Sequence, residues 1–442
     1  MEILLLFGVL FGLMAFGVPV FVAMAASALV TLAVTGLGAA TVLANTMVGG
    51  VDSFELLAIP FFVLVGELMN KAGLTQRIID LLMFFLGRFR GGLAQASVGV
   101  NLFASGVSGS APADAAAVSS VMLPAMRREG YTPQYAAAVN ASAAVVGPIM
   151  PPSIPMVFVA LVTQLSLGQL FLGGVGPAII LAGSMVGLIA WHAVRGRLPS
   201  RKTAAVTVGG GGSSEASAPS DERSLGRLFL EALPALLAPA FIIAGVFGGF
   251  ATITEMAVLA AFYVLLLGLV YRTLKVREVP AVLRDGAVFS STIMILFAAV
   301  GSFTYVIAAQ RVGDQVAEFV SGLDVGPTTF LLLTMVFFLV VGMVLDAVPA
   351  ILIFLPILLP VAVELGVDPI HFGVLVVVNL MIGLLTPPVG ALLYVLTKIG
   401  KVPFTALVKE TMPFVAVMLI GLLLMVLVPS IVTALPELVF GG

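Results

Sequence analysis

The sequence is poor in charge and in reactive side chains. Only 10% of its 442 residues are charged, two are histidine, and none is cysteine. A soluble domain carries about a quarter charged residues, so this composition excludes a protein surrounded by water. The missing cysteine excludes disulfides and thiolate chemistry. No HExxH or Walker sequence is present, which argues against a hydrolase or an ATP-driven pump, and the net charge of −2 gives no sign of nucleic-acid binding.

Long apolar runs fill most of the chain, which is 61% hydrophobic. Uncharged runs of 18 or more residues are typical of membrane helices, so the sequence predicts an all-α polytopic membrane protein without enzymatic activity. Segment 3–35 is predicted as two short helices; a single long helix, which would put the N-terminus inside, is the alternative. Helices are predicted near 3–16, 19–35, 56–70, 136–163, 175–194, 234–249, 256–271, 287–309, 372–397 and 412–434, with an interfacial helix at 74–90.

The basic residues give the predicted helices an orientation. Nineteen of the twenty Lys and Arg residues fall on one side of the predicted spans, with Arg311 the exception. By the positive-inside rule that side is the cytoplasm, which leaves both chain ends outside. Residues 203–221, TAAVTVGGGGSSEASAPSD, read as a flexible linker on the cytoplasmic side that divides the chain into halves.

Glycine and proline positions of the two halves coincide at an offset of 236 residues. Gly147 meets Gly383, and Pro151-Pro152 meets Pro387-Pro388. Because the first half makes an odd number of crossings, the second copy is predicted to run inverted, as in secondary transporters. The predicted repeats are 1–202, with a re-entrant hairpin at 91–126 and a broken helix at 136–163, and 222–442, with a hairpin at 325–363 and a broken helix at 372–397. For the second hairpin, two full helices at 326–345 and 347–363 are the alternative.

The interruptions predict ion sites. A helix broken inside a membrane exposes carbonyls that can coordinate a small cation and N–H groups that can hold an anion. Such backbone is tolerated only where protein or a wet cavity covers it. The first predicted cluster is the hairpin tip Ser108, Gly109 and Ser110 facing the break at 147–153. The second is the tip at 342–346 facing Thr386, Pro387 and Pro388. The alternative is that these breaks are packing kinks.

Two acids follow the hairpin tips. Asp114 and Asp346 would each sit in the first turn of a helix, where a carboxylate suits the helix dipole. Because carboxylates in membranes are costly, a coupling role is an alternative to capping. Glu255, in TITE, is predicted to close a capping box with Thr252. The residues considered for substrate binding or coupling are Ser153, Asp114, Asp346, Pro388 and Gly390.

At these motifs the chain resembles the large membrane subunit of the tripartite ATP-independent periplasmic (TRAP) transporters, within the ion-transporter superfamily. The stretches that carry the resemblance are SGSAPADAAAVSSVMLPAM (108–126), GPIMPPSIP (147–155), GGFATITEMA (248–257), LPILLPVA (355–362), DPIHFG (368–373) and GLLTPPVG (383–390). The family usually has a proline between the threonines of TITE, where this chain has Ile253.

The resemblance implies Na⁺-driven uptake of an organic acid (a dicarboxylate, sialic acid or keto acid) by an elevator movement. It implies two separate partner chains, a small four-helix membrane subunit and a periplasmic substrate-binding protein, in a bacterial or archaeal inner membrane. No cofactor other than Na⁺ as the coupling ion is implied. By similarity, sodium site 1 comprises Ser108, Gly109, Ser110, Ala111, Gly147 and Pro151, and sodium site 2 comprises Gly342, Leu345, Thr386 and Pro387. A self-sufficient organic-anion symporter or Na⁺/H⁺ exchanger of the same superfamily is the alternative function.

Overall fold

The computed structural model describes residues 2–36, 39–86, 91–104, 111–199, 225–248, 250–322 and 325–441. These residues are helical and contain no strand. The first half comprises α1 (Glu2–Ala15), α2 (Val20–Thr35), α3 (Ala39–Val51), η1 (Phe54–Leu57), α4 (Ala58–Lys71), α5 (Leu74–Leu86), α6 (Gly92–Ala104), α7 (Ala111–Arg128), α8 (Pro133–Ala144), η2 (Gly147–Ile149), α9 (Ile154–Thr163) and α10 (Leu167–Val194). The second half comprises α12 (Leu225–Phe247), α13 (Ile253–Val270), η3 (Val276–Glu278), α14 (Val279–Ala309), α15 (Val312–Ser321), α16 (Pro327–Val344), α17 (Ala347–Glu364), α18 (Pro369–Gly383), α19 (Ala391–Gly400), α20 (Phe404–Leu427) and α21 (Ser430–Phe440).

The prediction of a polytopic helical membrane protein is confirmed. In the described part of the chain, six helices are long and apolar enough to cross a membrane, or seven if the bent pair α8–α9 counts as one span. Segment 3–35 forms two helices, α1 and α2, which pack against each other. The capping box of α13 is present: the Thr252 amide donates to Glu255 Oε2 (2.7 Å), and the Glu255 amide donates to Thr252 Oγ1 (3.3 Å).

Two sequence predictions of helices are wrong. The sequence left 39–51 without a helix, but α3 lies there and leads through η1 into α4. The single helix predicted at 412–434 is in fact α20 followed by α21, and Pro429 lies between them. Pro429 cannot donate a helical hydrogen bond, and the break between the two helices falls at this residue.

Helix boundaries in the two halves match at the offset found in the sequence. Adding 236 to the bounds of α7 gives 347–364, the bounds of α17. The starts of α8 and α18 share their chemistry as well as their position, since each begins at a proline that follows a capping residue. Thr132 Oγ1 accepts from the Tyr135 amide (3.4 Å), and Asp368 Oδ1 accepts from the His371 amide (2.7 Å). An acceptor at this position stabilises a helix start by about 1 kcal/mol.

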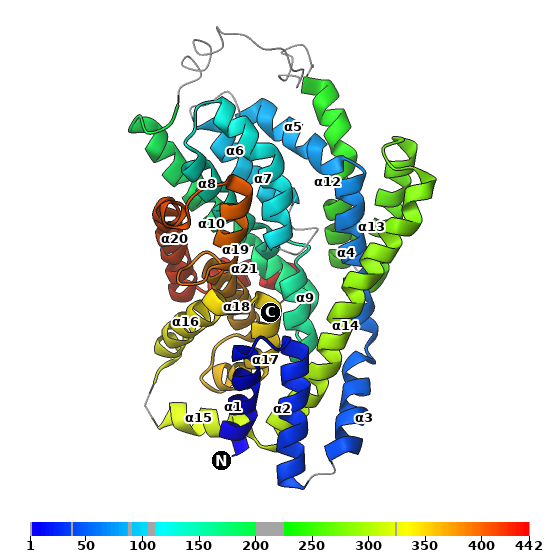
Figure 1. Ribbon diagram of the computed structural model, residues 1–442, viewed down its shortest axis with the longest axis vertical. Coiled ribbons are helices and arrows are strands. Elements are labelled where there is room, and N and C mark those ends of the chain that lie inside the picture. Colours follow the sequence, from blue (N-terminus) through cyan, green and yellow to red (C-terminus); the bar gives the residue numbers. More distant parts are fainter. Residues whose placement is uncertain are drawn as a thin grey trace.

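The helices form two units (Figure 1). In the scaffold unit, α1–α4 pack with α12–α14; in the hairpin unit, α6–α10 pack with α16–α21. Helices α5 and α15 connect the units, and Figure 1 shows α5 near the top of the molecule and α15 near the bottom. Because these two helices hold equivalent places in the two halves, their opposite positions show that the second copy is inverted. The predicted linker at 203–221, with the repeat boundaries at 202 and 222, lies outside the described residues, so the division of the chain there stays a prediction.

Candidate functional site: two interrupted helices

The first interruption separates α8 from α9. The chain makes the short 3-10 turn η2, passes through an extended Met150, and resumes as α9 at an angle of 40°. Prolines cause the break. Because Pro148 and Pro155 have no N–H, the carbonyls of Ala144 and Pro151 lose their helical donors. Almost all of this segment is buried, so these bare carbonyl oxygens face protein rather than lipid.

Ser153 organises the end of the first break. Its Oγ accepts from the Met156 amide (3.3 Å), which caps the start of α9, and donates to the Pro148 carbonyl. The side chain is 1% exposed. Ser153 therefore holds the break together, and we assign it a structural role beside the predicted one.

The second interruption separates α18 from α19. Here the Thr386 amide donates to Gly383 O (2.9 Å), and Thr386 Oγ1 donates to Ile382 O (3.0 Å). A hydroxyl that donates its one proton keeps its oxygen lone pairs as acceptors. Thr386 and Pro387 are half-buried and Pro388 is exposed, whereas Gly390 is buried. Both interruptions contain a cis Pro-Pro bond, Pro151-Pro152 in the first and Pro387-Pro388 in the second.

The second hairpin seats its tip directly on the second break. A Cβ added to Gly383 would lie 2.7 Å from Gly342 Cα, so α16 and α18 touch through their backbones. One residue later, Met343 O accepts from the Gly390 amide (3.2 Å). The chain then turns through an extended Leu345, and Asp346 Oδ1 caps α17 by accepting from the Ala347 amide (2.7 Å). The structure thus brings the predicted tip against the two ends of the second break, at Gly383 and Gly390, and the binding of an ion by Thr386 and Pro387 stays a prediction.

Each arm of this hairpin has 18 residues and is long and apolar enough to cross a membrane alone. That is the alternative the sequence left open. The interruption between the arms, at 345–346, lies within the predicted tip at 342–346, whereas the re-entrance of this hairpin stays a prediction.

Part of the first cluster cannot be placed. Ser108, Gly109 and Ser110 lie outside the described residues. Ala111 and Asp114 are described: both are buried in the first turn of α7. Helix α6 contacts both α8 and η2, so the first hairpin packs against the first break as the second hairpin packs against the second.

Contacts between the repeats bring the two interruptions to one region. Helix α7 packs against α19, and α17 packs against α9. The second arm of each hairpin therefore contacts the second half of the other repeat's broken helix. Helix α18 also contacts η2, so the first break packs against the broken helix of the second repeat inside the hairpin unit.

The sequence reasoning overlooked several buried polar groups beside the breaks. Ser97 Oγ donates to Asn140 Oδ1 (2.9 Å) between α6 and α8. The residues 236 positions later are Leu333 and Val376, so this packing is polar only in the first repeat. In α18, Asn379 Oδ1 is buried one turn before the break and has no hydrogen-bond partner in the described part of the chain. A side-chain amide inside an uncharged run was the signal that could have found Asn140 and Asn379.

Other candidate sites are poorer. Among the described residues, no three His, Asp or Glu side chains cluster as a metal site would require. An apolar groove of about 510 Å³ lies between α4 and α14, lined by residues such as Phe61, Leu64 and Met294. It belongs to the scaffold unit and not to the interruptions.

Comparison with known proteins agrees with this architecture. The family model described as "Tripartite ATP-independent periplasmic transporter, DctM component" matches residues 7–431. The chain belongs to this family. It is 34% identical to the sialic acid TRAP transporter large permease protein SiaM of Vibrio cholerae over 431 residues, 97% of each chain. It is also 34% identical to the 2,3-diketo-L-gulonate TRAP transporter large permease protein YiaN of Escherichia coli over 433 residues, 98% of each chain.

A solved structure shares the fold of this TRAP large permease subunit. The YdaH transporter of Alcanivorax borkumensis, described as having an unusual topology, superposes with a TM-score of 0.62 at 13% identity and covers 90% of this chain and 88% of its own. At that identity the likeness concerns the fold alone. The family resemblance inferred from the sequence motifs is confirmed by the family match.

Proposed function

We propose that this TRAP large permease subunit couples the uptake of an organic acid to Na⁺ entry. The observation that carries the proposal is the seating of the second hairpin on the second break, where Gly342 meets Gly383 and Thr386 keeps acceptor lone pairs. Broken helices in inverted repeats are where secondary transporters hold coupling ions and substrate. The described interruptions offer carbonyl and hydroxyl oxygens, the ligands suited to a hard cation.

Under this proposal the two ion sites follow the two breaks. Site 1 comprises the Ser108–Ala111 tip with Gly147 and Pro151, and site 2 comprises Gly342, Leu345, Thr386 and Pro387. The substrate carboxylate lies between them, near the helix starts that follow Ser153 and Gly390, because N-terminal helix ends favour negative charge. The relatives' names, which mention sialic acid and 2,3-diketo-L-gulonate, support an organic acid as the class of substrate.

We further propose that the hairpin unit moves against the scaffold unit as an elevator. The two units each have their own internal packing, and the amphipathic helices α5 and α15 connect them. The complete transporter would add a small four-helix membrane subunit and a periplasmic binding protein in the inner membrane, with residues 203–221 in the cytoplasm. Transport, and not catalysis, is then the activity of this chain.

Reconstitution into liposomes tests the coupling. Uptake of the acid bound by the cognate binding protein is expected to need an inward Na⁺ gradient, the small subunit and the binding protein, and to proceed without ATP. Radiolabelled uptake with each component omitted in turn is the measurement. Uptake by this chain alone would favour a self-sufficient symporter, and uptake without a Na⁺ gradient would contradict the ion coupling.

A Thr386→Ala variant tests the second ion site. It removes one candidate oxygen ligand, so the Na⁺ concentration for half-maximal uptake is expected to rise about 3- to 10-fold, as for one lost polar interaction. Thr411→Ala is the matched control, because Thr411 Oγ1 makes the same bond to the carbonyl four residues earlier (2.9 Å) in α20, away from the breaks. Equal Na⁺ activation of the two variants would contradict the placement of Thr386.

A further inference from the structure

Helix α3 presents an outward face that nothing in the described chain covers. It lies at the outer edge of the scaffold unit in Figure 1 and packs against α14 and α2 with its inner face. No described atom lies within 4 Å of a Cβ built on Gly49. The exposed residues are small or polar in the main: Ala40, Thr41, Ala44, Asn45, Val48, Gly49 and, directly after the helix, Asp52.

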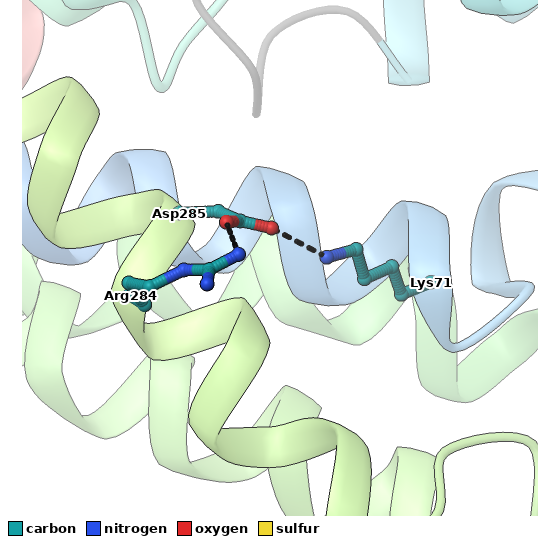
Figure 2. A network of polar contacts seen from close by, with 3 residues as sticks. All are labelled: Lys71, Arg284 and Asp285. Atoms are coloured by element: carbon teal, nitrogen blue, oxygen red, sulfur yellow. Dashed lines mark hydrogen bonds and ion pairs between the residues drawn. The ribbon is translucent and has the colours of Figure 1, made fainter.

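The depth of this face follows from its contact with α14. A Cβ on Gly301 would lie 2.8 Å from Gly50 Cα, so the two helices touch through their backbones there. Further along, α4 is tied to α14 by the ion pair of Lys71 Nζ with Asp285 Oδ2 (3.3 Å; Figure 2). From Gly286 to Ala309, α14 carries no charge, and Gly301 lies about 5 Å from the centre of that run at 1.5 Å per residue. Asp52 is thus a carboxylate near the middle of the membrane.

A carboxylate at that depth costs about 2.5–3.5 kcal/mol when it faces lipid. Small residues and amides on a membrane helix mark contacts with another helix, because small side chains let backbones approach and polar groups bond across the contact. In the part of the chain that the structure describes, the Asp52 carboxylate has no hydrogen bond and no ion pair. A helix of another chain can supply the partner that the described residues do not provide.

Two observations decide what kind of chain. The residue 236 positions after Asp52 is Val288, which is apolar and 63% exposed. Val288 lies inside the unbroken α14, so the repeat does not require the carboxylate and the helix break that occur between α3 and α4. The exposed α3 face also contains no Lys or Arg. In a twofold pair of this subunit through α3, the same face would meet itself and bring carboxylates together. A different protein with a complementary group fits the face, and a second copy does not.

We propose that the outward face of α3, with Asp52, docks a transmembrane helix of the small membrane subunit. That helix carries a basic or amide side chain that bonds to the Asp52 carboxylate at mid-membrane depth. The inference rests on the proposed function, which supplies the small subunit as partner, and it adds where that subunit binds.

Because the chain has no cysteine, single cysteines report on this face without background. Asn45→Cys and Val48→Cys, co-expressed in membranes with single-cysteine variants along each helix of the small subunit, are treated with a bismaleimide. Both are expected to crosslink to one helix of the small subunit. Ile420→Cys, on the outer face of α20 in the hairpin unit and 66% exposed, is the matched control and is expected to give no such product.

The carboxylate itself is tested by co-purification. Asp52→Leu is expected to lower recovery of the small subunit about 3- to 15-fold, as for one interhelical polar contact in a membrane, and Asp52→Glu is expected to retain it. If the small subunit co-purifies with the unaltered chain but crosslinks only outside α3, or if the α3 cysteines crosslink to a second copy of this chain, the inference is overturned while the proposed function stands. If the unaltered chain never retains the small subunit, both fail.

Discussion

Replacing Gly383 by valine is expected to lower Na⁺-driven uptake by about one to two orders of magnitude. A Cβ at this position would lie 2.7 Å from Gly342 Cα and 3.1 Å from Leu339 O. Those atoms belong to the backbone of α16, which cannot rotate away as a side chain can. Forcing the helices apart costs about 1–3 kcal/mol and would break the bond from the Gly390 amide to Met343 O. The second cluster would then lose its geometry.

The matched control for this change is Gly183→Val in α10. No described atom lies within 4 Å of a Cβ at Gly183, so the same substitution in another membrane helix is expected to leave uptake near the unaltered level. Uptake and its Na⁺ dependence are measured in liposomes after gel filtration has confirmed equal amounts of folded protein. Unaltered Na⁺ activation in Gly383→Val would mean that the close approach of Gly342 and Gly383 has no part in ion coupling.

The parts of this fold that the sequence predicted are those set by prolines and by charge. Four prolines between positions 148 and 155 remove helical hydrogen-bond donors within about two turns, and the sequence alone therefore placed the first break. Asp346 was expected to follow a hairpin tip and it caps α17. The matching offset of 236 residues was visible because glycine and proline are constrained by backbone geometry, which side-chain exchange does not change.

The parts that the sequence did not predict depend on which helices meet. Helix α3 contains two glycines, an asparagine and two threonines, which make it less apolar than the predicted spans, yet Gly50 secures it against Gly301 of α14. Likewise, no local pattern indicates that α7 packs on α19 and α17 on α9. Periodicity reports the faces of a single helix, whereas partner choice is a property of the whole chain.

The candidate site was likewise predictable from the sequence only in part. Thr386 stood out in the sequence as a hydroxyl beside a Pro-Pro pair, and Gly342 stood out as a glycine at the predicted tip of the second hairpin. The pairing of Gly342 with Gly383, and of Met343 O with the Gly390 amide, required coordinates. These are backbone contacts, and side-chain identity does not mark which carbonyl will accept.

The elevator proposal makes a second prediction with an all-or-none effect. In the described conformation the rings of Phe158 in α9 and Phe297 in α14 stack with centroids 5.2 Å apart, which joins the hairpin unit to the scaffold unit. Sliding of one unit past the other would separate this pair. A Phe158→Cys/Phe297→Cys variant, bridged by Hg²⁺ in the cysteine-free background, is therefore expected to lose essentially all uptake, and a thiol reductant is expected to restore it.

The control pair lies within one unit. The rings of Phe330 in α16 and Phe372 in α18 are 6.0 Å apart, and both helices belong to the hairpin unit. A Phe330→Cys/Phe372→Cys variant treated in the same way is expected to keep transporting, because a unit that moves as a rigid body does not change its internal distances. Uptake that survives bridging of Phe158 to Phe297 would show that the two units do not slide past each other at this contact. Loss of uptake in both variants would instead indicate motion within the hairpin unit, so the pair of measurements separates an elevator from local opening of a hairpin.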